Sequence, residues 1–262
     1  MNYRKNMNTK RALHLAVAFA AFALCTACTA KWHVAEVERT RLLVDSRFDN
    51  SIPQNASDFL APYKRKVDSV MSPVVGKVAC SMAASKPESK LSNLLSDILV
   101  WEGQRRGEKP DFSVYNMGGM RAAFSEGDVT FGDVLAVAPF ENKICFLTLT
   151  GKKTLELCRQ LAAIQGEGVS HGFEMVIGKD NSLKSVKING KEINPDGMYR
   201  VATLDYLAQG NGGLTAFKDA TAMVSPQDEA NNVRFIIIDY FKAAMAEGRA
   251  VDSKIEGRIK IE

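Results

Sequence analysis

Segments typical of strands and of helices follow one another irregularly in this chain, and this order restricts its fold more than any other feature. Short apolar runs rich in β-branched and aromatic residues predict strands. These runs span residues 112–115, 144–149, 173–177, 183–188, 199–204 and, as an edge strand, 257–261. Apolar residues at helical spacing predict helices over 91–99, 155–162 and 233–245. Because no regular βαβ repeat and no internal repeat is present, we expect an α+β fold, a single mixed domain.

Local signals mark several element ends. Lys179–Ser182 predicts the turn of a hairpin, and Asn189-Gly190 predicts a second turn. Ser225–Asp228 supplies a cap, a proline and an acid ahead of the helix at 233–245. Residues 59–75 carry apolar side chains at helical spacing, which we expect Pro62 and Pro73 to interrupt.

The N-terminus is typical of an export signal. Basic residues come first, residues 12–24 are almost entirely apolar, and small residues precede Cys28. The ending resembles a bacterial lipobox with Cys28 as the lipidated residue, although Cys25 stands where leucine is usual. We therefore expect a signal peptide at 1–27 and an exported cell-envelope lipoprotein held at the membrane by an N-terminal lipid. Cleavage by ordinary signal peptidase, without a lipid, is the alternative.

The charge of the chain belongs to this signal. Residues 1–27 hold four of the 34 basic residues and none of the 30 acidic ones, so removal leaves 30 of each and lowers the formal charge from +4 to zero. A basic patch for nucleic acid is thus not indicated, and we expect no polynucleotide partner. The remaining chain is long enough for one domain, which we place at 59–262 after a tether and lead-in at 28–58.

Cysteine and histidine are too few for most metal or redox sites. Besides Cys25 in the signal and Cys28 directly after it, only Cys80, Cys145 and Cys158 remain, without a CxxC spacing. We expect Cys145 and Cys158 to be buried thiols. Only two histidines, His33 and His171, follow the signal, so we expect no metal ligands and no cofactor in this chain.

A ligand site is indicated by Asn116–Arg121, a run with a glycine pair directly after a predicted strand. The glycines, Gly118 and Gly119, let backbone approach a ligand closely, and Arg121 has the planar fork that suits phosphate or carboxylate. Phe140 and Asn142, just ahead of the next strand, offer a stacking face and a hydrogen-bonding amide.

A second ring, Tyr206, opens the glycine-rich run Tyr206–Gly213 after a strand. Two rings on separate loops can hold a base between them. For each residue an ordinary role competes: a surface arginine for Arg121, a core ring for Phe140, and a simple turn for the glycine-rich run.

No catalytic group stands out. The chain has neither a phosphate-binding G-x-x-x-x-G-K-[ST] loop nor a G-x-S-x-G elbow. His171 is a candidate general base, but no carboxylate or nucleophile is tied to it by sequence, and a surface-loop histidine is the default interpretation.

Several ordered motifs carry a resemblance to one family. NMGGMR, GDVTFGDVLAVAPFEN, FLTLTGKKTLEL and YRVATLDYLAQG, with ESKLSNLLSDIL upstream, resemble the C-terminal domain of 5′-nucleotidases, the family that includes UDP-sugar hydrolase. The resemblance covers nearly the whole chain after Phe59. In that family this domain binds the nucleotide, while a separate metallophosphoesterase domain holds two metals and the catalytic residues.

The resemblance implies a role for each site residue. Asn116 and Arg121 would contact the phosphate–ribose end of the substrate. Phe140 would stack on the base, Asn142 would bond to its edge, and Tyr206 would be the opposing ring.

Two departures from the family pattern stand out. The family's G-G-D-G reads Gly210-Asn211-Gly212-Gly213 here, so the aspartate expected to hold the ribose is missing at Gly212, and Asn211 replaces it only if the loop shifts by one residue. Where the family has an arginine near Ser85, the nearest cation is Lys86.

The resemblance thus implies a nucleotide-binding domain that is not catalytic alone and presents nucleotide to a separately encoded metallophosphoesterase in extracytoplasmic nucleotide catabolism. The competing interpretations are a non-catalytic nucleoside- or nucleotide-binding lipoprotein, and a degenerate domain kept for protein–protein contact.

Overall fold

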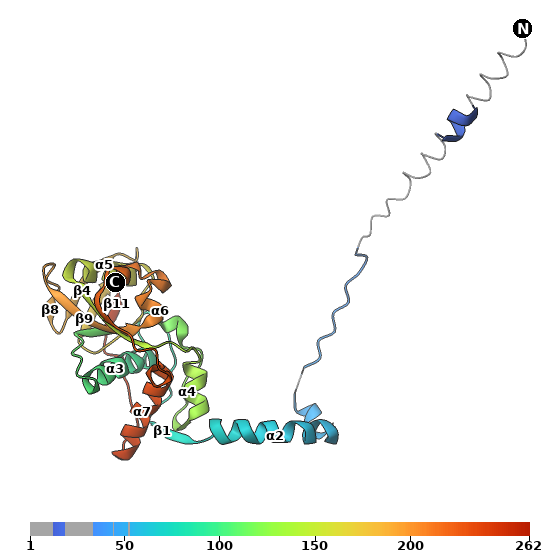
Figure 1. Ribbon diagram of the computed structural model, residues 1–262, viewed down its shortest axis with the longest axis horizontal. Coiled ribbons are helices and arrows are strands. Elements are labelled where there is room, and N and C mark those ends of the chain that lie inside the picture. Colours follow the sequence, from blue (N-terminus) through green and yellow to red (C-terminus); the bar gives the residue numbers. More distant parts are fainter. Residues whose placement is uncertain (1–12, 19–33, 44, 52) are drawn as a thin grey trace, which may run out of the picture. The chain divides into compact units, whose positions relative to one another are not determined.

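The computed structural model describes residues 13–18, 34–43, 45–51 and 53–262 (Figure 1). The chain forms two units, Met1–Ala56 and Ser57–Glu262, and all candidate ligand-binding residues belong to the second. In the first, residues 13–18 are helical and Ser46–Ser51 form the 3₁₀ helix η1. Cys28 and most of the expected export signal lie outside the described residues. Among the described helices, none has the length and apolar character needed to cross a membrane.

Helix α2 runs from Gln54 to Met71 without a break at Pro62. The expectation that Pro62 interrupts this segment is therefore wrong. The φ that proline fixes is compatible with a helix. Proline removes one backbone hydrogen bond and crowds the preceding turn, but the rest of the helix can continue around it. Pro73 does lie beyond the end of the helix, as expected.

The central element of the second unit is a five-stranded sheet in the order β10-β4-β9-β2-β5. Its strands are β10 (Thr221–Val224), β4 (Ile144–Thr150), β9 (Met198–Leu204), β2 (Phe112–Tyr115) and β5 (Gly168–Val169). Strands β4 and β9 pair antiparallel along their whole length, and β2 runs parallel to β9. The predicted strands at 112–115, 144–149 and 199–204 are confirmed.

A second sheet has the order β11-β6-β7-β8. Its strands are β11 (Ile259–Ile261), β6 (Phe173–Ile177), β7 (Leu183–Ile188) and β8 (Lys191–Glu192). The hairpin of β6 and β7 and the edge position of β11 are confirmed. Asn189 and Gly190 have φ of 51° and 75°, the left-handed conformation that a two-residue hairpin turn requires between β7 and β8.

A third pair, β1 (Val74–Val78) with β3 (Gly127–Thr130), was not predicted. Both strands are short and contain a glycine, so their apolar alternation is weak. Strand β10 was missed for another reason, because its four residues are all exposed and show no alternation of polar and apolar side chains.

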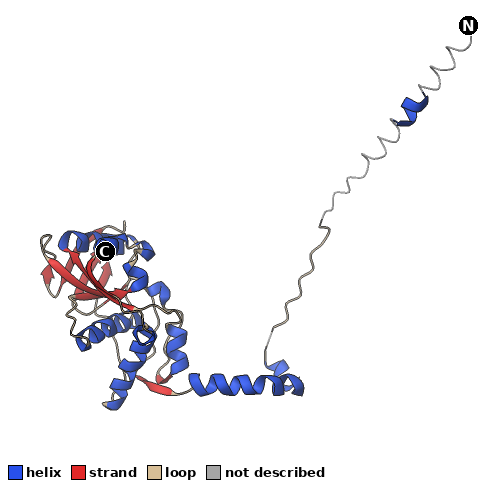
Figure 2. Ribbon diagram, viewed as in Figure 1, coloured by secondary structure: helices blue, strands red, loops and turns tan. Residues whose placement is uncertain are grey.

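Helices cover both faces of the central sheet (Figure 2). The remaining helices are α3 (Lys90–Arg105), α4 (Phe131–Val137), α5 (Gly151–Ala163), α6 (Asp205–Ala208) and α7 (Val233–Ala246), with the 3₁₀ turns η2 (Met117–Gly119), η3 (Asn211–Gly213), η4 (Thr215–Asp219) and η5 (Glu229–Asn231). Alternate residues of β4 enter different cores: Ile144 and Phe146 pack with α3 and α7, while Cys145 and Leu147 pack with α5. This arrangement, with one core on each face of the sheet, matches the predicted α+β class.

Helix α7 begins without the cap that the sequence indicated. Residues 225–228 lie before η5, and Asn232, at the helix start, makes no side-chain cap. Instead, the N–H of Val233 donates to the carbonyl oxygen of Asn142 at 2.9 Å. A loop that precedes β4 thus satisfies the helix end, which sequence periodicity cannot reveal.

The buried thiols are as expected. Cys145 and Cys158 are fully buried, and burial raises the pKa of Cys145 to about 11 and that of Cys158 to about 12. Neither is a thiolate at neutral pH, so neither is available as a nucleophile.

Candidate functional site

Three loops that carry predicted site residues emerge at one edge of the central sheet. Because β2 and β9 are parallel, their carboxyl ends, Tyr115 and Leu204, lie at the same edge. Leu204 pairs with Ile144, the first residue of β4, so the loop before β4 joins them there. The topology brings together segments that are far apart in the sequence.

The first of these loops is η2, directly after β2. The side-chain oxygen of Asn116 accepts from the N–H of Gly118 at 3.1 Å and so caps the turn. A Cβ added at Gly119 would lie 3.3 Å from the Asn116 amide nitrogen, closer than side chains normally approach. The glycine pair therefore lets this loop pack tightly around Asn116.

A buried carboxylate supports the same loop. Glu167, in the segment before β5, accepts from the N–H of Met117 and lies 3.9 Å from the Lys86 ammonium. Burial raises the pKa of Glu167, against the opposing effects of the Met117 hydrogen bond and the Lys86 charge. The sequence offered no signal for this role, because the two segments are about 50 residues apart.

The second loop carries Phe140 and is fastened to α7. The Arg234 guanidinium donates to the carbonyl oxygen of Pro139 at 2.7 Å, and Val233 binds the Asn142 carbonyl as described above. The Phe140 ring itself is 49% exposed, which excludes the core role that competed for it. Its backbone is held while its ring face stays open to a ligand.

The third loop carries Tyr206, and Asp205 ties it to the second. One carboxylate oxygen of Asp205 accepts from the N–H of Tyr206 at 2.8 Å and from the N–H of Lys143 at 3.0 Å. The N–H of Asp205 in turn donates to the Lys143 carbonyl at 2.9 Å. Asp205 thus sets the position of the two ring-bearing loops relative to each other, a role that sequence reasoning missed. The only sequence signal is an acid at the end of a strand, next to the ring.

These loops enclose a cavity of about 280 Å³. Its lining residues are Asn116, Gly118, Gly119, Phe140, Asn142 and Tyr206. All six come from the set that the sequence indicated, and Tyr206 is 38% exposed. Two rings, side-chain amides and close backbone in one hollow suit a planar ligand with a polar edge.

Arg121 does not line this cavity. It is exposed, and its guanidinium donates to the carbonyl oxygen of Gly118 at 3.4 Å, so it lies beside the glycine loop. Neither Asp128 nor Asp133 is its partner, because Asp128 pairs with Lys77 and Asp133 belongs to the capping box at the N-terminus of α4.

Asn211 and Lys86 are likewise absent from the lining. The Asn211 side chain donates to the carbonyl oxygen of Tyr206 at 2.9 Å and so holds the glycine-rich loop. Gly212, where the family pattern has aspartate, has φ of 67°, a conformation in which aspartate is tolerated better than most residues. Lys86 donates to the carbonyl oxygen of Ile164.

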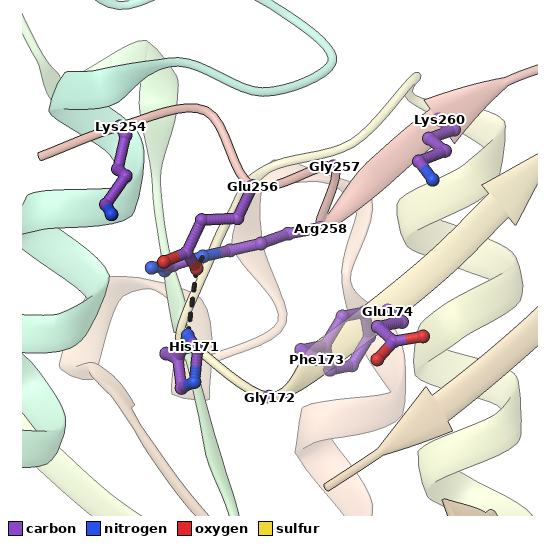
Figure 3. A pocket seen from close by; sticks show the side chains of 9 residues that line it. All are labelled: His171, Gly172, Phe173, Glu174, Lys254, Glu256, Gly257, Arg258 and Lys260. Atoms are coloured by element: carbon purple, nitrogen blue, oxygen red, sulfur yellow. Dashed lines mark hydrogen bonds and ion pairs between the residues drawn. The ribbon is translucent and has the colours of Figure 1, made fainter. Parts of the chain in front are cut away.

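A larger cavity, of about 610 Å³, lies elsewhere, between β6 and the C-terminal segment (Figure 3). The buried Arg258 at its base is already bound, bidentate to Asp97 at 2.7 and 2.9 Å and to Glu256 at 2.9 Å. His171 lies on an exposed loop, where its Nδ1 is 2.9 Å from Glu256. Because these charged groups bind one another, the smaller, ring-lined cavity is the better candidate site.

No metal centre is found in the part of the chain that the structure describes. Among those residues, no group of three or more histidine, cysteine or acidic side chains is arranged to hold an ion. The cavity residues can bind and orient a ligand, but none of them forms a nucleophile–base pair.

The fold and the site together define the class of this protein: an α+β domain with a candidate ligand cavity where the strands of its central sheet end. The family model for the C-terminal domain of 5′-nucleotidases matches residues 74–219, and the chain belongs to this family. Protein UshA of Escherichia coli is 24% identical over 205 residues, covering 77% of this chain and 36% of that protein. Cell wall protein Lmo0130 of Listeria monocytogenes is 27% identical over 191 residues, 67% of this chain and 24% of that protein.

A solved structure shares the fold. The 5′-nucleotidase precursor from Thermus thermophilus superposes with a TM-score of 0.69 at 24% identity, covering 79% of this chain and 43% of that chain. This chain therefore spans about a third or less of the two curated relatives above, and less than half of the solved neighbour.

The raised pKa of Glu167 predicts a dependence of stability on pH. Burial favours the protonated carboxyl, so this group stabilises the fold most below its ordinary pKa of 4.5, and the contribution is lost as pH rises through the raised value. Glu167→Gln should remove this loss, so its unfolding free energy relative to wild type should increase with pH. Urea unfolding from pH 4 to 7 measures this, with the exposed Glu174→Gln as control. A difference between Glu167→Gln and wild type that stays constant with pH would contradict the assignment.

Proposed function

We propose that this domain binds a nucleotide in the ring-lined cavity and presents it to a separately encoded metallophosphoesterase. The observation that carries the proposal is that Phe140 and Tyr206, both exposed, face one cavity with the amides of Asn116 and Asn142. Stacking is tolerant of base identity, while amides bond to polar edges, which together suit a nucleobase. Membership of the 5′-nucleotidase C-terminal family supports a nucleotide as ligand.

In this proposal the chain binds the nucleotide and the partner protein hydrolyses it. The catalytic metals would belong to the partner, because two histidines are too few for a di-metal phosphoesterase site here. The chain also spans only a minor part of its relatives, so the hydrolytic activity of a complete 5′-nucleotidase would need residues outside this domain.

We place the protein in the cell envelope, exported by residues 1–27 and anchored through a lipid on Cys28. The N-terminal sequence carries this proposal, and similarity to a protein described as a cell wall protein is consistent with it.

Gly212 favours a second candidate function. Without the family's aspartate, the domain loses a hydrogen-bond partner for the ribose hydroxyls. The side chain of Asn211 does not replace it, because this side chain already donates to the carbonyl oxygen of Tyr206. Such a site suits a non-catalytic lipoprotein that captures nucleosides or nucleotides and needs no partner. Phosphate release on mixing with a metallophosphoesterase from the same organism distinguishes the two, because a capture protein would slow release by withholding substrate.

The purified chain should not hydrolyse nucleoside monophosphates. We expect no phosphate release above buffer with magnesium, manganese or zinc, because the cavity supplies no metal ligands and no nucleophile–base pair. A colorimetric phosphate assay measures this, with Phe140→Ala purified in parallel. Metal-dependent release that the Phe140→Ala variant reduces would contradict the proposal, whereas release that is unchanged in the variant identifies a contaminating phosphatase.

Arg121→Lys should weaken binding of nucleotides and leave binding of nucleosides unchanged. The arginine lies beside the glycine loop, and lysine keeps the charge but loses bidentate contact with a phosphate. Calorimetric titration with a nucleoside and its 5′-monophosphate measures both affinities, and Arg159→Lys, an exposed arginine on α5, is the control. Equal losses for both ligands would show that Arg121 makes no phosphate contact.

A further inference from the structure

Helix α2 presents a stripe of apolar side chains that the domain leaves uncovered. Its large apolar residues are Phe59, Leu60, Tyr63, Val67 and Val70, each more than half exposed. At 3.6 residues per turn these side chains share one face, an arc of roughly 120°. None of the residues of α2 is buried. Apolar residues that gather on one exposed face, unlike scattered ones, mark an interaction site.

The charged residues of α2 are arranged around this stripe. Lys64 and Lys66 fall at its two borders, whereas Asp58, Arg65 and Asp68 lie on the polar side. Lys64 pairs with Asp68 at 2.5 Å, but both side chains are largely exposed, so the pair is weak and can exchange for another anion. A surface that covers the stripe would therefore meet positive charge along both edges.

We propose that this face of α2 binds the surface of a lipid bilayer rich in anionic headgroups. An apolar face opposite a polar one, on a helix with low overall hydropathy, is typical of helices that lie in the membrane interface. Lysines at the borders can bury their stems and reach lipid phosphates. The rings of Phe59 and Tyr63, with centroids 5.7 Å apart, supply the aromatic residues favoured at that depth.

Lipid fits these observations better than a protein surface does. Protein interfaces are depleted in lysine, and two copies of α2 paired along their stripes would bring the border lysines against each other. The inference goes beyond nucleotide binding and does not depend on it. In the cell it would give the proposed lipid anchor a second membrane contact.

The test uses residues 29–262, which lack the expected signal and the acylated cysteine, so that only the protein surface can bind. We expect sedimentation with vesicles of phosphatidylcholine containing about a third phosphatidylglycerol, and much less with phosphatidylcholine alone. The double variant Phe59→Ser/Tyr63→Ser should lower the partition coefficient about tenfold or more.

The charge variants Lys64→Gln and Lys66→Gln should each lower the partition coefficient roughly fivefold on the anionic vesicles. Met223→Ser and Ile255→Ser, which change exposed apolar residues outside α2, should leave it unchanged.

Equal melting temperatures of all variants would show that the domain is folded. The proposal is overturned if folded wild type ignores both vesicles, or if binding survives the double variant. A dimer in light scattering that the double variant dissociates, without vesicle binding, would assign the stripe to a second copy instead. Capture of a metallophosphoesterase that depends on the stripe, again without vesicle binding, would assign it to that protein.

Discussion

Replacing Phe140 or Tyr206 with alanine is expected to weaken nucleoside binding by on the order of 1–3 kcal/mol each, roughly 5- to 150-fold. The reason is that each ring lines the cavity and is open to solvent, so its face is available for a base, whereas neither ring contributes to the buried core. Folding stability should therefore change little. Calorimetric titration of each variant with the same nucleoside measures the loss.

The chain offers matched controls for both rings. Phe59 and Tyr63 are exposed aromatic residues on α2, away from the cavity, so Phe59→Ala and Tyr63→Ala should bind the nucleoside as wild type does. Wild-type affinity in both Phe140→Ala and Tyr206→Ala, for a ligand that binds wild type, would show that the rings do not hold the base.

Asp205→Ala is expected to reduce both stability and affinity. It leaves the N–H groups of Lys143 and Tyr206 without their shared acceptor, which should cost about 1–3 kcal/mol of unfolding free energy. The two ring-bearing loops would then lose their common anchor, and nucleoside affinity should fall even at temperatures where the variant is fully folded. Thermal unfolding and calorimetric titration provide the two measurements.

Asp205→Asn separates the role of the oxygen from that of the charge. An amide oxygen can accept the same two N–H bonds, so this variant should recover most of the stability and affinity. If Asp205→Asn is as defective as Asp205→Ala, the charge rather than the loop connection is what matters. If Asp205→Ala loses stability but binds like wild type, Asp205 has no positioning role.

Much of the fold follows from the sequence because its buried elements have strong local patterns. Strand β2 is buried at all four positions and is rich in aromatic and β-branched residues, and the alternating faces of β4 enter both cores. Short or exposed elements such as β3 and β10 lack such patterns. The start of α7 at Val233 was predicted, but its cap was not, because its first N–H group is satisfied by Asn142, about 90 residues earlier.

The same distinction holds for the residues of the candidate site. Residues whose chemistry faces a ligand, such as Phe140 and Tyr206, could be proposed from the sequence because both rings lie next to a predicted strand. Phe140 is close to the amide of Asn142, and Tyr206 opens a glycine-rich run. Residues that position them, such as Asp205 and Glu167, act through backbone hydrogen bonds between distant segments, and only the folded chain shows those contacts. The sequence also grouped Asn211 with the ligand residues, whereas its side chain bonds to the loop.

Titration calorimetry of residues 29–262 with a panel of nucleosides and their 5′-monophosphates tests the central claim most directly, that the ring-lined cavity binds nucleotides. We predict saturable binding of at least one mononucleotide at one site per chain, weakened in Phe140→Ala and Tyr206→Ala and unchanged in Phe59→Ala. A folded wild-type chain that binds no member of the panel, or that binds one equally well after both cavity rings are removed, would contradict it.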